Sequence, residues 1–94
     1  MELHDAVKIL RWRNKQSLQE VANAIDSSKS HVWEIELNRQ MNPTIDTVKK
    51  LARHFKITTS QLIGEKPFKI TEREVLFLKE YYEELQLKQR RKGK

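Results

Sequence analysis

The spacing of apolar residues predicts helices along the whole chain, and no run of alternating residues is long enough to indicate a strand. Leu3, Ala6, Val7 and Leu10 recur every three or four positions, which places them on one face of a first helix. We expect this helix to fade near Asn14. The pattern therefore predicts an all-α protein.

A capping box at Ser17-Leu18-Gln19-Glu20 begins the second predicted helix, because Ser17 can accept the Glu20 amide while Glu20 reaches back to the cap amide. Residues 26–27 interrupt the pattern. A third helix follows, capped by Ser27 or Ser28, and ends near Leu37–Asn38, where Asn38 can adopt the left-handed conformation that closes a helix. The residues that these two helices would bury are Val21, Ala22, Ile25, Val32 and Ile35.

Two more helices are predicted after a polar loop over residues 38–43. Thr44 caps the fourth, and a second capping box, Thr58-Thr59-Ser60-Gln61, begins a short fifth helix that Gly64 ends. The residues expected to point inward are Ile45, Val48, Leu51, Ala52 and Phe55 of the fourth helix and the apolar pair Leu62 and Ile63 of the fifth.

A proline-containing stretch, residues 65–70, reads as a linker between residues 1–64 and a last helix over residues 71–88. That helix begins with a third capping box at Thr71-Glu72-Arg73-Glu74. Its seam of Val75, Leu78, Tyr82 and Leu85 has spacings of 3, 4 and 3, and it is too short for a free-standing coiled coil, so it must pack on something. We expect it to dimerise or to dock another protein. Residues 89–94 are expected to fray into a basic tail.

Composition excludes several classes of protein. With 94 residues and no cysteine, the chain fits one domain without disulfides or a cysteine-based zinc site. Short apolar runs and the absence of a signal-peptide pattern predict a cytoplasmic protein that does not enter a membrane. His4, His31 and His54 lack metal-binding spacing, and no glycine-rich loop precedes a helix. We therefore expect no enzyme activity, no metal and no cofactor.

The net charge of +6 is distributed unevenly. Residues 1–64 carry a net charge of +3, residues 65–85 a net charge of −2, and residues 86–94 a net charge of +5. A basic chain of this kind favours a polyanionic partner, with nucleic acid ahead of a membrane surface.

Two helices joined by a short turn, with the small Ala22 where they cross, form a helix-turn-helix arrangement. From about Val7 to Gly64 the sequence resembles the phage-repressor-like (Cro and xenobiotic-response-element type) helix-turn-helix family. The residues that carry this resemblance are Leu10-Arg11, Ser17 with Glu20-Val21-Ala22, the serine-rich turn, Val32 with Ile35-Glu36, Pro43-Thr44-Ile45, Leu51-Ala52 and Leu62-Ile63. The resemblance implies a five-helix lambda-repressor-like domain, here followed by one C-terminal helix.

Several positions depart from the usual family pattern. Asp26 stands where the family usually has a turn glycine, an exchange that aspartate tolerates because it adopts left-handed conformations more easily than most residues. Asn14 and Lys15 replace the usual Arg and Gly after the first helix, and Leu18 replaces a polar residue that often touches the DNA backbone. The fold is unaffected by these changes, whereas the DNA contacts could differ.

The resemblance places Lys29 and Ser30 first in the major groove, with Trp33 and Glu34 on the same exposed stripe. A lysine there can donate to guanine O6 or N7, and the alternative is a solvated lysine. Trp33, which pairs with Leu37 one turn later, could contact a thymine methyl or sugar, or pack under the last helix. The expected backbone contacts are Arg39, Gln40 and Asn42 in the loop, with Lys15, Ser28 and the Leu18 position.

A largely buried ion pair between Arg11 and Glu36 is also implied by the resemblance. The function that we expect is sequence-specific binding of double-stranded DNA by a small transcriptional repressor, as a homodimer on a palindromic operator. The alternative is an antitoxin or partner-regulated switch whose last helix binds another protein. A non-specific or RNA binder that relies on the basic tail is a weaker third hypothesis.

Overall fold

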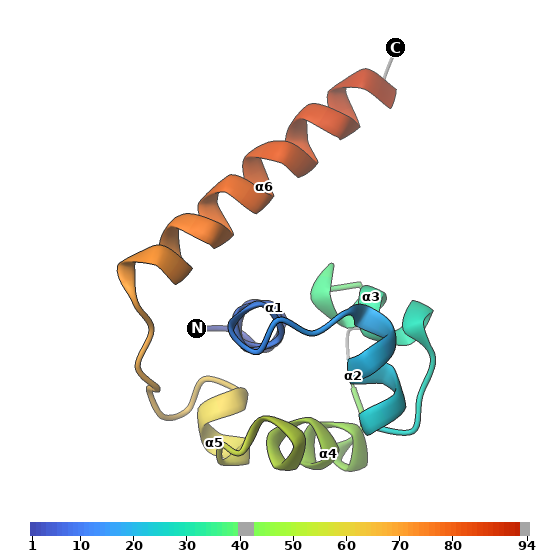
Figure 1. The fold of residues 1–94 in the computed structure, drawn as a ribbon, viewed down its shortest axis with the longest axis vertical. Coiled ribbons are helices and arrows are strands. Elements are labelled where there is room, and N and C mark those ends of the chain that lie inside the picture. Colours follow the sequence, from blue (N-terminus) through green and yellow to red (C-terminus); the bar gives the residue numbers. More distant parts are fainter. Residues whose placement is uncertain (40–42, 93–94) are drawn as a thin grey trace.

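The computed structural model describes residues 1–39 and 43–92, and within these ranges it contains only helices. Their bounds are α1 Leu3–Arg13, α2 Leu18–Ala24, α3 Lys29–Glu36, α4 Ile45–Phe55, α5 Thr59–Leu62 and α6 Glu72–Lys92. Helices α1 to α5 form a small bundle, and α6 leaves it as a long arm (Figure 1). The predicted all-α fold class is confirmed.

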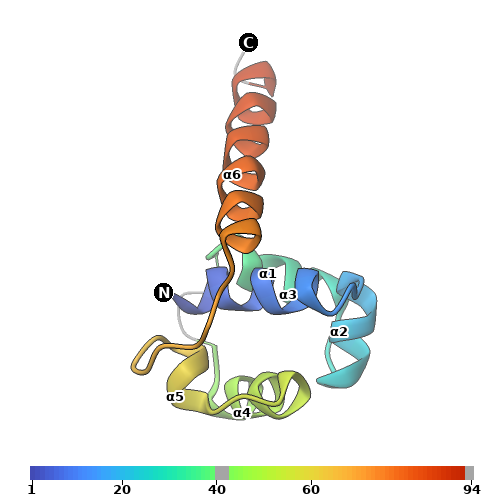
Figure 2. The same ribbon diagram turned by 60° about the vertical axis from the view of Figure 1, so that its left-hand side comes forward.

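Helix α1 lies at the centre and contacts α3, α5 and α6 (Figures 1 and 2). Its residues Ala6 to Leu10 are all buried, which an amphipathic helix with one covered face would not show. The pattern of apolar residues did not identify Lys8 or Ile9 as buried. Lys8 is buried because α6 crosses the face of α1 that α3 and α5 leave open.

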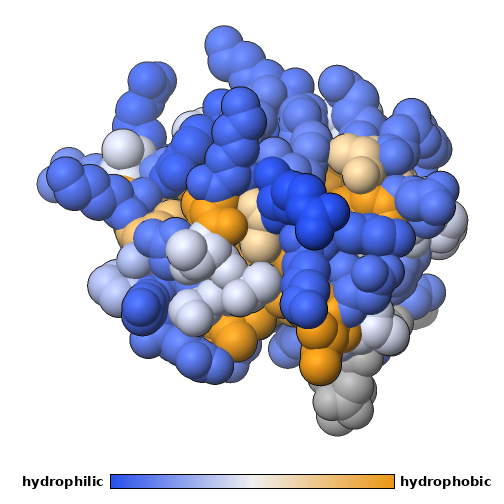
Figure 3. Space-filling view, turned by 90° about the horizontal axis from the view of Figure 1, so that it is seen from below, coloured by the Kyte–Doolittle hydropathy of each residue, from blue (hydrophilic) through white to orange (hydrophobic). Residues whose placement is uncertain are grey.

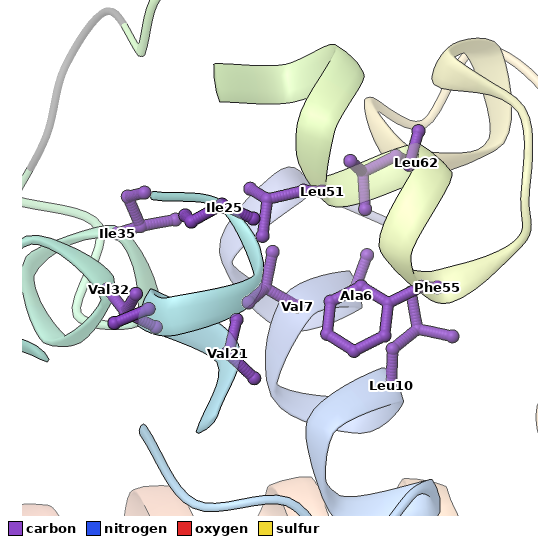
Figure 4. Close-up of a cluster of buried hydrophobic side chains, with 12 residues drawn as sticks. Ala6, Val7, Leu10, Val21, Ile25, Val32, Ile35, Leu51, Phe55 and Leu62 are labelled. Atoms are coloured by element: carbon purple, nitrogen blue, oxygen red, sulfur yellow. The ribbon is translucent and has the colours of Figure 1, made fainter. Parts of the chain in front are cut away.

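The core lies among α1 to α5 and contains nearly every residue expected there (Figure 4). Its buried members are Ala6, Val7, Leu10, Val21, Ala22, Ile25, Val32, Ile35, Leu51, Ala52, Phe55 and Leu62. The expectation for two residues is wrong, since Ile45 is 74% exposed and Ile63 is 41% exposed. Ile45 is the first residue of α4, and the stripe of α4 that packs on the core begins one turn later, at Val48. Ile63 is the C-cap of α5.

The surface around α4 and α5 is mostly hydrophilic and carries separate apolar patches (Figure 3). Ile45 and Ile63 belong to this part of the chain, and each leaves apolar surface in contact with solvent. Single exposed apolar residues are common on folded domains and need no special explanation.

Capping interactions fix the helix starts as the sequence predicts. Both capping boxes of the bundle form, one at Ser17 and one at Thr58. Ser28, rather than Ser27, caps α3 by accepting the His31 amide at 3.1 Å. Asn38 closes the turn after α3 with a φ of +59°, and Asp26 has a φ of +55° between α2 and α3. Aspartate therefore occupies the left-handed position that the family usually gives to glycine.

Helix α6 continues to Lys92, four residues beyond its predicted end near Lys88. The prediction of a frayed tail is therefore wrong for residues 89–92, whose backbone is helical. Residues 93 and 94 lie outside the described part of the chain. Gln, Arg and Lys are good helix formers, and basic residues near a helix C-terminus interact favourably with its dipole. Only the first part of α6 lies against α1, and the rest rises away from the bundle (Figure 2).

Candidate nucleic-acid interface

Four of the residues expected at DNA line one hollow on the outer surface of α2 and α3. Leu18 from the start of α2 and Lys29, Ser30 and Trp33 from α3 enclose about 400 Å³. Lys29 and Ser30 are exposed, as is Glu34 on the next turn. The structure thus brings together residues from both helices of the helix-turn-helix and leaves them open to a partner.

The orientation of α3 follows from the residues that it buries. Val32 and Ile35 are at most 4% exposed and pack into the core, which turns the stripe of Lys29, Ser30 and Trp33 outward. The capping box at Ser17 fixes the start of α2, so Leu18 is held at the rim of the same hollow. A rigid scaffold of this kind is what base recognition in a major groove needs.

Trp33 lines the hollow and is 38% exposed. The tryptophan that packs against α6 is Trp12, whose ring stacks on Phe77 with 4.7 Å between ring centroids and 13° between ring planes. The structure thereby favours the outward alternative for Trp33 over packing under the last helix.

The structure places some of the expected backbone contacts near this hollow and others away from it. Arg39 is exposed, and its amide donates to the Glu34 carbonyl at 2.9 Å, which places it directly after α3. Gln40 and Asn42 lie outside the described residues. Lys15 is exposed but lines a second hollow, beside α1 and α6. Ser28 is the N-cap of α3.

The implied ion pair is present in the structure. Arg11 donates to Glu36 through Nε at 2.6 Å and through Nη2 at 2.9 Å, a two-bond geometry that matches a carboxylate well. Glu36 is fully buried, and the Arg11 side chain is 20% exposed. A third bond, from Arg11 Nη1 to the Gln16 carbonyl at 3.1 Å, ties the loop after α1 to the same group. The end of α3 is therefore held to α1.

The contact between α1 and α6 contains polar residues that the sequence pattern did not indicate. Lys8 is 1% exposed, and its Nζ donates to the Tyr82 hydroxyl at 2.6 Å and lies 4.1 Å from the centroid of the Tyr82 ring. The Tyr82 hydroxyl donates to the Asp5 carboxylate. Burial lowers the pKa of Lys8 and raises the pKa of Tyr82. A lysine inside an otherwise apolar helix pattern gave no sequence signal for this role.

A second ion pair fastens the beginning of α6. Arg13 donates to Glu74 through Nε at 2.6 Å and Nη2 at 2.9 Å, and Nη2 also donates to the Lys69 carbonyl at 2.8 Å. Thr71 caps the helix, because its hydroxyl accepts the Glu74 amide at 3.2 Å while Glu74 accepts the Thr71 amide at 2.7 Å. The hydrogen bond from Arg13 lowers the pKa of Glu74 to about 2.

The expected seam on α6 is divided between two environments. Tyr82 is engaged with α1 of the same chain, and Leu78 and Leu85 are half-buried. Val75 is 51% exposed. The α6 face toward α1 is built from Glu74, Phe77, Tyr81 and Tyr82. Tyr82 belongs to the predicted seam, and each of the other three residues precedes a seam residue by one position.

Other kinds of site find no support in the part of the chain that the structure describes. Across residues 1–39 and 43–92, no three His, Asp or Glu side chains gather as a metal site would need. In the same ranges, no helix combines the length and the apolar character that crossing a membrane requires.

Comparison with known proteins agrees with this geometry. A family model described as helix-turn-helix matches residues 9–62, which is just over half of the chain. An uncharacterised HTH-type transcriptional regulator of Rickettsia conorii is 36% identical over 53 residues, covering 56% of this chain and 49% of the relative. A similarly named regulator of Rickettsia prowazekii is 34% identical over 53 residues, covering 56% and 58%. The matched region thus spans about half the length of these curated relatives. The model match lies over α1 to α5, and the chain belongs to the helix-turn-helix family.

Proposed function

We propose that this protein binds double-stranded DNA with sequence preference and regulates transcription. The observation that carries the proposal is the exposed row of Lys29, Ser30 and Trp33 on α3, joined by Leu18 of α2 in one hollow. The major groove admits an α-helix and presents a distinct pattern of donors, acceptors and methyl groups for each base pair. Two relatives are named as HTH-type transcriptional regulators, which supports the same function.

Repression is the form of regulation that this site can perform by itself. A protein bound over a promoter blocks other proteins from it without any further contact, whereas activation needs a surface that recruits one. We therefore propose a repressor, and its own upstream DNA is the first sequence to test. Binding to that DNA at least tenfold tighter than to a shuffled duplex, at one stated salt concentration, would support the proposal. Equal binding to both would contradict it.

Lys29 provides the sharper test of base recognition. If Lys29 contacts a base, Lys29→Ala costs about 1–3 kcal/mol on the preferred duplex and less on a shuffled duplex. Fluorescence anisotropy with both duplexes measures the difference, and Ser30→Ala serves as a milder variant on the same exposed turn. Equal weakening on the two duplexes would make Lys29 a phosphate contact instead.

A dimer that reads a palindromic operator is the assembly that we propose. Two copies related by a two-fold axis place their α3 helices in successive major grooves, about 34–36 Å apart. The support is the free side of α6, where Val75, Leu76 and Leu87 are each more than half exposed. Leu76 and Leu87 are 11 residues apart, which is close to three helical turns, so they share one face.

The same exposed residues also support the alternative of an antitoxin or partner-regulated switch. In that case the free side of α6 binds a different protein while α3 binds DNA. The two alternatives differ in the oligomeric state of the purified chain, since only the first forms a dimer without a partner.

A further inference from the structure

A second hollow lies beside α1, between the loop that follows it and the first turn of α6. It encloses about 620 Å³ and brings together side chains from residues 11–16 and residues 71–74, which are far apart in sequence. Its lining residues are Arg11, Trp12, Arg13, Lys15, Gln16, Thr71, Arg73 and Glu74. Four of these eight residues are cations, and only one is an acid.

Two of the four cations are already paired. Arg11 is bound to Glu36, and Arg13 is bound to Glu74. Within the described residues, no carboxylate lies within 4.0 Å of the charged groups of Lys15 or Arg73, and both residues are exposed. The hollow therefore has two cations available to an anion from outside.

Both cations are carried by rigid backbone. Lys15 has a φ of +54°, and its amide donates to the Trp12 carbonyl at 3.0 Å, while the next amide, that of Gln16, donates to the Arg11 carbonyl at 3.0 Å. On the opposite side, Arg73 lies in the first turn of α6. That turn is fixed by the cap at Thr71 and by the two bonds from Arg13 to Glu74. Cations held by rigid elements lose less backbone freedom when an anion binds.

The hollow adjoins the proposed DNA-reading surface along the chain. Lys15 and Gln16 line it, and two residues later Leu18 lines the hollow of α3. An extended polyanion that lies against α3 carries phosphates at regular spacing on either side of the groove. For DNA bound in this way, Lys15 would face the backbone phosphates that pass the start of α2.

We propose that this hollow binds a phosphate of the DNA backbone, with Lys15 and Arg73 as its donors. The proposal rests on the proposed function and extends it, because Arg73 lies outside residues 9–62, the region matched by the family model. The first turn of α6 then has a role in DNA binding that is separate from any role of α6 in assembly. Because a phosphate contact reads no sequence, removing it weakens binding to all duplexes alike.

The salt dependence of DNA binding tests this proposal, with Arg73→Gln in the full chain. For B-DNA, the slope of the logarithm of affinity against the logarithm of salt concentration has a magnitude of about 0.9 for each phosphate that the protein neutralises. We expect Arg73→Gln to reduce the magnitude of this slope by about that amount. We also expect it to weaken binding to the preferred duplex and to a shuffled 20-base-pair duplex by the same factor, about 3- to 10-fold at low salt. Arg73→Lys, which keeps the charge, restores most of the slope.

Arg53→Gln is the matched control, because it removes the same charge from an exposed position on α4. An unchanged slope in Arg73→Gln, or an equal decrease in Arg53→Gln, would overturn the phosphate site, since the effect would then be absent or due to net charge alone. If the unmodified chain binds no duplex, the proposed function fails and this inference fails with it. If it binds with sequence preference while Arg73→Gln behaves normally, only the inference fails. Circular dichroism checks that each variant is folded.

Discussion

Glu36 is fully buried, and two hydrogen bonds from Arg11 hold its carboxylate. Removing one partner of such a pair leaves the other charge uncompensated, which typically costs about 3–5 kcal/mol. We expect Arg11→Ala to lower the free energy of unfolding by about this amount, because it strands the fully buried Glu36 carboxylate. Glu36→Ala should lower it somewhat less, because the Arg11 side chain that it leaves behind still reaches solvent. Urea denaturation followed by circular dichroism measures both. Either variant with the unfolding midpoint of the parent chain would show that the pair does not stabilise the fold.

The Glu74 carboxylate makes stability depend on acidity. Its pKa is lowered from 4.5 to about 2 in the folded chain, so the stabilisation that it provides is complete above pH 4.5 and is lost as the pH falls toward 2. The shift corresponds to at most about 3–4 kcal/mol, and solvent around the partly exposed Arg13 reduces this to about 1–2 kcal/mol. We expect Glu74→Gln to be less stable than the parent at pH 7, with the difference closing below pH 4.5. Urea denaturation across this pH range measures it.

Glu72→Gln is the control for this experiment, because Glu72 occupies the same turn and is exposed. Its effect on the free energy of unfolding should be small at every pH. A difference between Glu74→Gln and the parent that stays constant from pH 7 to pH 2 would contradict the assignment, since it would show an effect unrelated to the charge of residue 74.

At the scale of the helices, the capping residues show how much of the fold follows from local sequence. Lys56 closes α4 in a left-handed conformation, with φ +59° and ψ +42°, which costs about 1 kcal/mol for a residue other than glycine. We expect Lys56→Gly to raise the free energy of unfolding by about 0.5–1 kcal/mol. Lys49→Gly, at an exposed interior position of the same helix, should lower it by about 1 kcal/mol. Thermal denaturation of the pair tests the prediction, and a shift of the same sign in both would contradict it.

The helices themselves could be predicted because their signals are local. A capping box needs only four adjacent residues, and the apolar stripes of α1 to α4 need only about two or three turns. The identity of the helix that covers each face is not local information. Lys8 reads as a surface residue within α1, yet α6 buries it through Tyr82, 74 positions later in the sequence. The same limit applies to Ile45. It lies on the predicted apolar face of α4, but it is in the first turn, which does not reach the core.

Of the two hollows described above, the one on α3 could be predicted from the sequence and the one between α1 and α6 could not. The α3 hollow follows from burying Val32 and Ile35, which leaves Lys29, Ser30 and Trp33 outside. Lys15 and Arg73 line the same hollow only because of where α6 lies. The sequence of the linker before α6 has no pattern from which this position could be predicted. Sequence therefore indicated the residues that are proposed to read bases, while the structure was needed for the second hollow.

At the scale of the whole molecule, α6 has two different sides, one packed on α1 and the other exposed. One side is taken by α1 through Phe77, Tyr81 and Tyr82, so substitutions there would disturb the fold of the single chain. The other side carries Leu76 and Leu87, which are 54% and 56% exposed. An assembly through α6 must use this free side, and a test of assembly must leave the first side intact.

We therefore expect Leu76→Asp combined with Leu87→Asp to make the chain monomeric without lowering its free energy of unfolding, because both side chains are in solvent in the single chain. The monomer should lose most of its affinity for a palindromic duplex and keep its affinity for a single half-site, since each half-site is read by one α3. Sedimentation velocity without DNA measures the oligomeric state.

Ile45→Asp is the control, because it places the same charge at another exposed apolar residue and should leave the dimer intact. A dimer that survives the α6 substitutions but not Ile45→Asp would move the interface to α4, and a parent chain that is already monomeric would favour binding of a different protein to α6.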